Sequence, residues 1–157
     1  MTGQGHEAFV EPPRDEIPVL SRQHVAAMEA SDADEVWILA GMHHVILYTV
    51  GRVSGKTHAV ALPYWMDPEG RRVVVASFSG APRDPDWYLN FTAGDGNREL
   101  LVGSQHGRFW AKAEILDGED YDRTWAALTA DREYYRDYQT RCERRIPLVR
   151  LHELRPA

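Results

Sequence analysis

The sequence predicts an α+β protein built on an antiparallel β-barrel of about six strands with peripheral helices. Three observations point to this class. Strand-like segments are grouped early in the chain, helical segments fall between the later strands, and the regular strand–helix alternation of a doubly wound parallel sheet is missing. The 157 residues are enough for one domain with its own core, and no internal repeat divides them.

The N-terminal region divides into an arm and a first helical part. Residues 1–19 are rich in proline, glutamate and glycine and lack apolar periodicity, which predicts an arm that is flexible or drapes over the body. Residues 20–157 are expected to form the single barrel domain. Apolar residues at helical spacing follow Ser21, a cap-like residue, and a second short helix is expected to end at Gly41.

Three consecutive strands follow. The segments 43–50, 59–66 and 71–78 are rich in β-branched and aromatic residues, which favour strands. Asp67–Gly70 is a strong turn signal between the last two. Pro63 must lie where the ladder needs no N–H donor.

The remaining segments mix helices with paired strands. Asp84 and Pro85 resemble an N-cap and a first-turn proline, and predict a helix through Phe91. Two strands are expected at 98–103 and 107–116, a helix at 119–135 and a last strand at 146–151.

Composition and charge argue against several functional classes. A formal net charge of −6 disfavours a general nucleic-acid binder. Cys142 is the single cysteine, which rules out an internal disulfide, gives no cysteine pair for zinc and fits a reducing compartment. His43 and His44 would point to opposite faces of a strand, so no metal site is expected. With no signal-peptide pattern and no apolar run near ~18 residues, we expect a cytoplasmic protein without stable membrane insertion.

The stretch Gly51–His58 has the composition of an anion site. Two glycines allow sharp turns and close approach of backbone N–H groups, and Arg52, Lys56 and His58 supply positive charge. The spacing is not that of a Walker A loop, and no Gly-x-Gly-x-x-Gly fingerprint occurs in the chain. An ordinary basic hairpin loop is the alternative interpretation.

Four separated motifs occur in order over about residues 45–152. They are Leu47–Lys56, then Leu62-Pro63-Tyr64, then Val74–Ser77 with Gly80-Ala81-Pro82, Pro85, Trp87 and Asn90, and finally Tyr135-x-x-Tyr138-Gln139 with Arg144-x-Ile146-Pro147. Together they resemble the deazaflavin-dependent nitroreductase family. The resemblance implies a split β-barrel, coenzyme F-420 as the cofactor, and reduction of quinones, nitro compounds or activated double bonds by its reduced form.

The resemblance also implies the cofactor-binding residues. The phosphate and acidic tail of the coenzyme would be held by Arg52, Ser54, Gly55, Lys56 and His58, and the further contacts would come from Tyr64, Ser77, Phe78, Trp87 and Asn90. The chain departs from the family pattern at Val53, His58 and Phe78, where members usually have a basic or polar residue, and at Ser79, which replaces a glycine. The departure at Val53 would be explained if its side chain pointed into the barrel and another basic residue, such as Arg83, bound the ligand instead.

For catalysis the resemblance implies Tyr135, Tyr138 and Ser77 near the substrate. Two phenols three residues apart lie on one helical face and would donate hydrogen bonds to a developing oxyanion or enolate. Packing in the core is the alternative for Trp87 and for either tyrosine. Two further alternatives remain open: an FMN-dependent reductase, and a small-molecule binder that has lost redox activity. The expected partner is a small-molecule substrate, and the protein itself is expected to be a monomer or a homodimer.

Overall fold

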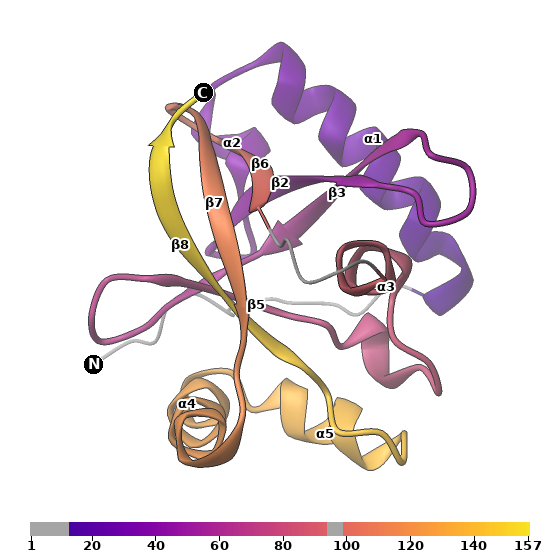
Figure 1. Cartoon of the computed structure of the whole chain (residues 1–157), viewed down its shortest axis with the longest axis vertical. Helices are drawn as coiled ribbons and strands as arrows, with labels where there is room; N and C mark the ends of the chain where they lie inside the picture. Colours follow the sequence, from indigo (N-terminus) through magenta and orange to yellow (C-terminus); the bar gives the residue numbers. More distant parts are fainter. Residues whose placement is uncertain (1–12, 94–98) are drawn as a thin grey trace.

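The fold is built on one eight-stranded antiparallel sheet. A computed structural model describes residues 13–93 and 99–157 (Figure 1), so most of the predicted arm, residues 1–12, lies outside the described residues. The strands are β1 (Ile38–Leu39), β2 (Met42–Val50), β3 (Thr57–Pro63), β4 (Trp65–Met66), β5 (Arg72–Val75), β6 (Glu99–Ser104), β7 (Gly107–Ile115) and β8 (Leu148–Pro156). Six of the eight span four residues or more, in agreement with the predicted number.

The sheet curls into a barrel because the continuous segment that contains β3 and β4 pairs with β2 on one side and with β5 on the other. The order is β2-β6-β7-β8-β5-β4, and β3 pairs with the other edge of β2. β3 and β4 are separated only by Tyr64, whose N–H donates to the carbonyl of His43 at 2.9 Å. At this bend the chain therefore stops pairing with β2 and begins to pair with β5, and the strand predicted at 59–66 is divided into β3 and β4. The predicted antiparallel barrel is confirmed.

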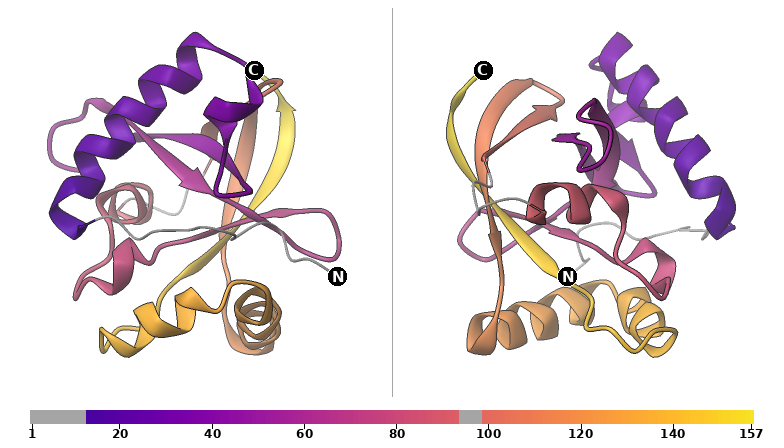
Figure 2. Two further views of the ribbon diagram at one scale, coloured as in Figure 1. Left: turned by 180° about the vertical axis from the view of Figure 1, so that it is seen from behind. Right: turned by 45° about the vertical axis from the view of Figure 1, so that its right-hand side comes forward.

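Five α-helices surround the barrel in the described residues. They are α1 (Ile17–Ala30), α2 (Asp34–Trp37), α3 (Asp86–Thr92), α4 (Gly118–Asp131) and α5 (Tyr134–Thr140), with short 3-10 turns η1 (Arg14–Glu16) and η2 (Phe78–Gly80). In Figures 1 and 2, α1 lies along one side of the barrel and α4 and α5 lie together at the opposite end.

The helix boundaries differ from the prediction at three places. α2 ends at Trp37 rather than near Gly41, because Ile38 and Leu39 are extended and pair with β2 as β1. α1 begins at Ile17 rather than Ser21, because Pro18 lies in the first turn, where its missing N–H needs no partner. Ser21 is not the cap: its hydroxyl accepts the N–H of Ala61 at 3.1 Å and joins α1 to β3. The helix predicted at 119–135 is two helices, because Arg132 leaves helical geometry with φ −127° and ψ 80°.

Alternation along the strands separates two main cores. Inside the barrel, Val45 and Leu47 of β2 are fully buried with Val149 of β8. On the outer side of the sheet, Leu148 packs in a second cluster with residues of α4 and α5. The period of two along each strand therefore serves both layers at once.

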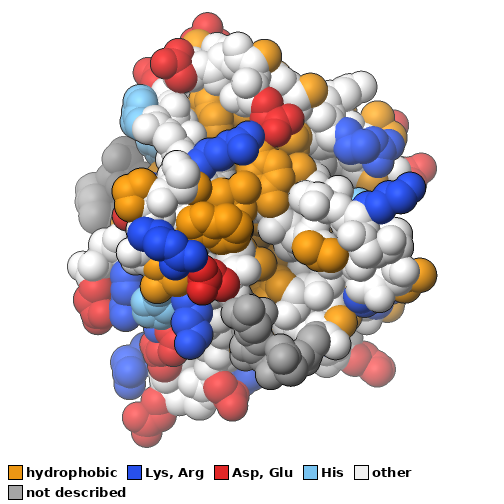
Figure 3. All heavy atoms as spheres, turned by 45° about the horizontal axis from the view of Figure 1, so that its top comes forward, with side chains coloured by type: hydrophobic (Ala, Val, Ile, Leu, Met, Phe, Trp, Pro, Cys, Tyr) orange, Lys and Arg blue, Asp and Glu red, His pale blue; other side chains and the backbone are white. Residues whose placement is uncertain are grey.

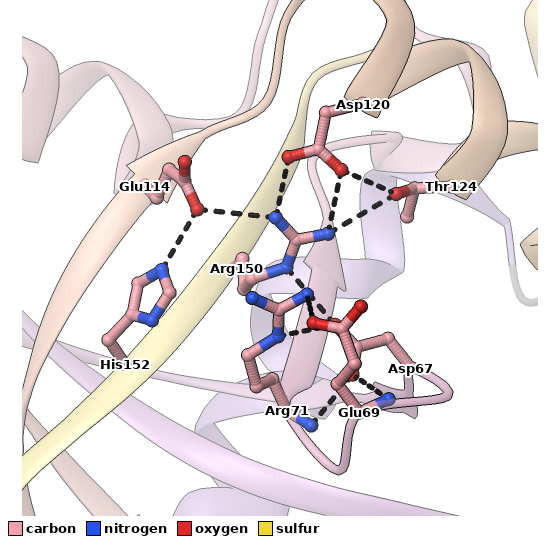
Figure 4. Close-up of polar contacts among 8 residues, drawn as sticks. All are labelled: Asp67, Glu69, Arg71, Glu114, Asp120, Thr124, Arg150 and His152. Atoms are coloured by element: carbon pink, nitrogen blue, oxygen red, sulfur yellow. Dashed lines mark hydrogen bonds and ion pairs between the residues drawn. The ribbon is translucent and has the colours of Figure 1, made fainter.

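A buried arginine fastens α4 to the sheet (Figure 4). The Arg150 side chain on β8 is 4% exposed and donates to Asp67 at 3.1 Å, to Glu114 at 3.2 Å and to Asp120 at 2.7 Å and 3.1 Å. Arg71 donates to the same Asp67 carboxylate at 2.9 Å. Burial alone would raise the pKa of Asp67, but the hydrogen bonds from Arg71 outweigh it and hold that pKa below its usual range.

One face of the surface carries a band of hydrophobic side chains in a central hollow, bordered by basic and acidic side chains (Figure 3). Among residues 13–93 and 99–157, the helices are all too short or too polar to cross a bilayer. The expected cytoplasmic location stays a prediction.

Candidate functional site

The basic loop connects β2 to β3 and closes on itself. The N–H of Gly51 donates to the carbonyl of Lys56 at 2.7 Å, and the N–H of Gly55 donates to the carbonyl of Gly51 at 2.9 Å. Gly55 has φ +72°, a conformation that other residues adopt only with strain. The glycine requirement inferred from the sequence therefore has a structural cause at this position.

Gly51 is surrounded closely by two side chains of the loop. A Cβ at this position would lie 2.6 Å from Ser54 Oγ and 2.8 Å from His58 Nε2, which are themselves 3.3 Å apart. Ser54 Oγ also accepts the N–H of Lys56 at 3.2 Å, so this hydroxyl orders the loop. The side chains of Lys56 and His58 are exposed and remain accessible to a ligand.

Arg52 is held by Asn90 of α3. Asn90 Oδ1 accepts both the backbone N–H of Arg52 at 3.2 Å and its Nη1 at 2.8 Å, while Asn90 Nδ2 donates to Thr49 Oγ1 at 3.2 Å. Asn90 therefore joins the loop, β2 and α3. The structure brings together two predicted site residues that are 38 positions apart in the chain.

Asp86 lies between two arginines. Its Oδ1 accepts Arg52 Nη2 and Arg83 Nη1, each at 3.2 Å. The hydrogen bond from Arg83, followed by that from Arg52, holds the pKa of Asp86 below its usual range. Val53 does not point into the barrel as suggested, because it is 94% exposed.

Ser77 and Phe78 were predicted as the end of the strand 71–78, but they follow β5, which ends at Val75. Phe78 and Ser79 have φ values of 44° and 52°, in the left-handed region that favours glycine. Such strain persists only where surrounding contacts enforce it, and it is common at ligand sites. Ser79, which replaces the usual glycine of the family pattern, thus has the left-handed backbone conformation that glycine favours.

Arg144 supplies those contacts. Its guanidinium donates to the carbonyls of Ala76 at 3.0 Å, Ser77 at 2.8 Å and Ala81 at 2.9 Å, and to the Asp84 carboxylate at 2.8 Å. Asp84 is therefore not the N-cap of α3, which has Pro85 at that position and no side-chain cap. Arg144 belonged to a motif of the resemblance, but its role in fixing the Ser77 segment required the structure.

Trp87 and Tyr64 lie apart from the exposed loop. Trp87 is 6% exposed and stacks on Phe91 inside the barrel, with ring centroids 5.9 Å apart. Tyr64 follows the far end of β3, about 20 Å along the strand from the basic loop, and its ring lies under the guanidinium of Arg72 at 5.2 Å. Trp87 therefore belongs to the barrel core, and Tyr64 lies near the other end of β3 from the loop.

Tyr135 and Tyr138 are buried in the second core. They are 4% and 5% exposed, with ring centroids 5.9 Å apart in an edge-on arrangement. α5 packs against η2, since a Cβ on Gly80 would lie 2.4 Å from the carbonyl oxygen of Tyr138. The tyrosines are therefore next to the strained segment but not open to solvent, and contact with a substrate would need α5 to move.

A cavity of about 540 Å³ lies elsewhere, between the end of α1 and the β6–β7 hairpin. Its walls include Trp37, Ile46 and Gly103, and none of the predicted site residues lines it. Tyr48 at this cavity donates to Glu29 at 2.7 Å; burial, followed by this hydrogen bond, raises the pKa of Tyr48 to about 12.

No metal centre is formed by the part of the chain that the structure describes, where no group of three or more His, Cys, Asp or Glu residues could hold an ion. His43 is exposed, whereas burial lowers the pKa of the neighbouring His44 to about 4. The two rings face different neighbours, Tyr64 for His43 and His24 for His44.

The loop geometry suits a phosphorylated, acidic cofactor. The exposed side chains of Lys56 and His58 flank Gly51, where a Cβ would displace the ends of the Ser54 and His58 side chains, and the guanidinium of Arg52 is ordered beside them by Asn90. Such an arrangement of cations around a glycine turn recognises oxyanions.

Comparison with known proteins agrees with this geometry. A family model described as F420H(2)-dependent quinone reductase matches residues 20–153. An F420H(2)-dependent quinone reductase of Mycobacterium tuberculosis is 32% identical over 106 residues, which cover 67% of this chain and 70% of that protein.

Two solved structures share the fold. One, described as an F420-H2 dependent reductase (FDR-A), has a TM-score of 0.57 and 29% identity over 69% of this chain and 93% of its own. The other, described as a domain-swapped dimer, has a TM-score of 0.61 and 26% identity over 90% of this chain and 100% of its own. The predicted resemblance is confirmed, and the chain belongs to the F420H(2)-dependent quinone reductase family.

Proposed function

We propose that this chain is an oxidoreductase that uses reduced coenzyme F-420 to reduce a quinone, a nitro compound or an activated double bond. The observation that carries the proposal is the basic loop: Lys56 and His58 are exposed beside Gly51, and Asn90 fixes Arg52 next to them. Family membership supports the same cofactor. Neither FMN nor a loss of redox activity is favoured by these relatives.

Lys56, Arg52 and His58 would bind the phosphate and acidic tail. Each charge-assisted hydrogen bond contributes about 1.5–3 kcal/mol when well formed, so two of them would account for a large share of micromolar affinity.

The other end of the cofactor would lie toward the Ser77 segment. When bound, the reduced deazaflavin supplies the hydride. Ser77 and Phe78 would orient the ring, because Arg144 fixes their backbone and Phe78 presents a half-buried apolar side chain. Trp87 would support this wall from inside the barrel rather than contact the ligand.

Tyr135 and Tyr138 are proposed as hydrogen-bond donors to the substrate oxygen. They lie beside the strained segment through the contact of α5 with Gly80, which supports their nearness to the ring. Phenylalanine at either position keeps the packing but removes the donor. If donation matters, Tyr138→Phe lowers kcat by about 10-fold or more at temperatures where the variant stays folded; an unchanged kcat would show that the tyrosine only packs.

A homodimer is the proposed assembly. A relative described as a domain-swapped dimer matches over its whole length, which supports this choice over a monomer. Sedimentation equilibrium of the full chain distinguishes the two, with a single species near 17.9 kDa contradicting the dimer.

A fluorescence titration tests the cofactor. Oxidised F-420 and FMN are titrated in parallel at two ionic strengths into the wild-type protein, Arg52→Ala and Lys56→Ala. We expect salt-sensitive binding of F-420 that each substitution weakens about 10-fold. Binding of FMN alone would reject the cofactor, and binding of neither would favour the non-redox alternative.

A further inference from the structure

Two arginines from different parts of the chain converge on one carboxylate oxygen beside the basic loop. Arg52 Nη2 and Arg83 Nη1 each lie 3.2 Å from Asp86 Oδ1, so the two nitrogens are within about 6.4 Å of each other. We call Arg52, Arg83 and Asp86 the arginine clamp.

The stability of the fold does not require this clamp. The side chains of Arg52, Arg83 and Asp86 are 32%, 59% and 64% exposed, and ion pairs with such exposure contribute little to folding. The arrangement nevertheless stands next to a loop in which Val53 provides no charge. Arg83 therefore supplies the second guanidinium that the loop itself lacks.

The contacts of Arg52 differ at its two terminal nitrogens. Nη1 is fixed by Asn90 at 2.8 Å, and Nη2 has the longer contact with the exposed Asp86. Exchange of one acceptor at Nη2 would thus leave the position of Arg52 unchanged. Arg83 donates to the same exposed Asp86 oxygen, and Asn90 fixes only Arg52 of these two arginines.

Resting on the proposed function, we propose that Asp86 occupies the place of a coenzyme oxyanion in the ligand-free protein, and that Arg52 and Arg83 transfer from Asp86 to that oxyanion on binding. Arg83 is then a further cofactor-binding residue. Asp86 is an internal competitor that lowers affinity while it keeps the two cations together. The oxyanion is either the phosphate or a glutamate carboxylate of the tail, since both offer the same kind of acceptor.

A double-mutant cycle separates this proposal from simple charge neutralisation. We expect Arg83→Gln to weaken F-420 binding about 5- to 10-fold and Asp86→Asn to strengthen it about 3-fold. In the Asp86→Asn background, Arg83→Gln must still weaken binding. If its effect disappears there, Arg83 only neutralises Asp86 and the proposal is wrong.

The exposed pair Arg123 and Glu119 on α4 is the matched control. Its members are four residues apart and 3.7 Å from one another. Arg123→Gln and Glu119→Gln make the same changes in net charge and should alter the affinity by less than about 2-fold. Equal effects at both pairs would contradict a local role of the clamp.

Arginine side-chain NMR tests the clamp without the coenzyme. Inorganic phosphate and a γ-linked triglutamate are titrated into the full chain while the Nε–H resonances of Arg52 and Arg83 are followed. Movement of both resonances supports the clamp, and the probe that moves them identifies the oxyanion. If both move while F-420 fails to bind, the proposed function is wrong and the clamp stands; if neither moves, the clamp is overturned even if F-420 binds.

Discussion

Replacing Arg144 with methionine should strongly destabilise the fold around Ser77. The Arg144 side chain is 14% exposed, and its guanidinium makes four hydrogen bonds, three of them to carbonyls of the segment from Ala76 to Ala81. Bonds to a charged group contribute about 1.5–3 kcal/mol each, and part of this returns when water reaches the freed carbonyls. We therefore expect a loss of about 3–5 kcal/mol, or a fall in Tm of about 6–20 °C for a chain of this size.

The neighbouring arginine provides the control. Arg145 is 52% exposed, with one ion pair to Asp117 at 3.0 Å and a contact with the Tyr121 ring. Urea unfolding followed by tryptophan fluorescence should give a loss below about 1 kcal/mol for Arg145→Met. A loss for Arg144→Met within 1 kcal/mol of this control would refute the account of how the segment is held. At temperatures where the variant stays folded, weaker binding of F-420 is expected as well, because Ser77 and Phe78 lose their fixed backbone.

Two further predictions concern the loop and the buried cluster. Gly51→Ala should weaken F-420 binding about 10-fold or more because its Cβ would displace Ser54 and His58, and unchanged affinity in the titration would exclude close packing there. Arg150→Met should cost about 3 kcal/mol at pH 7, since it removes a buried guanidinium whose charge-assisted hydrogen bonds join Asp67, Glu114 and Asp120. The hydrogen bond from Arg150 lowers the pKa of Asp120. The ion pair therefore stabilises the folded state above the ordinary carboxylate pKa, and this stabilisation is lost below about pH 4. The difference in the free energy of unfolding between the wild type and Arg150→Met, measured with urea, should therefore become smaller in acid. A difference that grows in acid would contradict the role given to the ion pair of Arg150 with Asp120.

The sequence predicted the barrel because strand composition is a local signal. The β-branched and aromatic residues of 43–50 indicated β2, and the grouping of strands separated this fold from a doubly wound sheet. The bend at Tyr64 was missed because it depends on β3 and β4 pairing with different partners. The break at Arg132 was missed for a related reason, since no glycine or proline marks it and the residue is buried at 1% exposure by tertiary packing.

The candidate site was predicted in part. Composition alone identified the loop around Gly51 and Lys56, and the resemblance added residues from distant segments. The contacts of Arg52 with Asn90 and with Asp86 each join residues more than thirty positions apart, and no local pattern encodes them. The roles assigned to individual site residues stay predictions.

Turnover tests the central claim most directly. Reduced F-420 is mixed with a soluble quinone and the wild-type protein, and the return of the oxidised coenzyme's fluorescence is followed against Lys56→Ala and the control Arg123→Gln. We predict protein-dependent oxidation with a rate that saturates in F-420, a KM about 10-fold higher for Lys56→Ala, and no change for the control. No oxidation above the protein-free rate, with quinone, nitro and enone acceptors alike, would contradict the account.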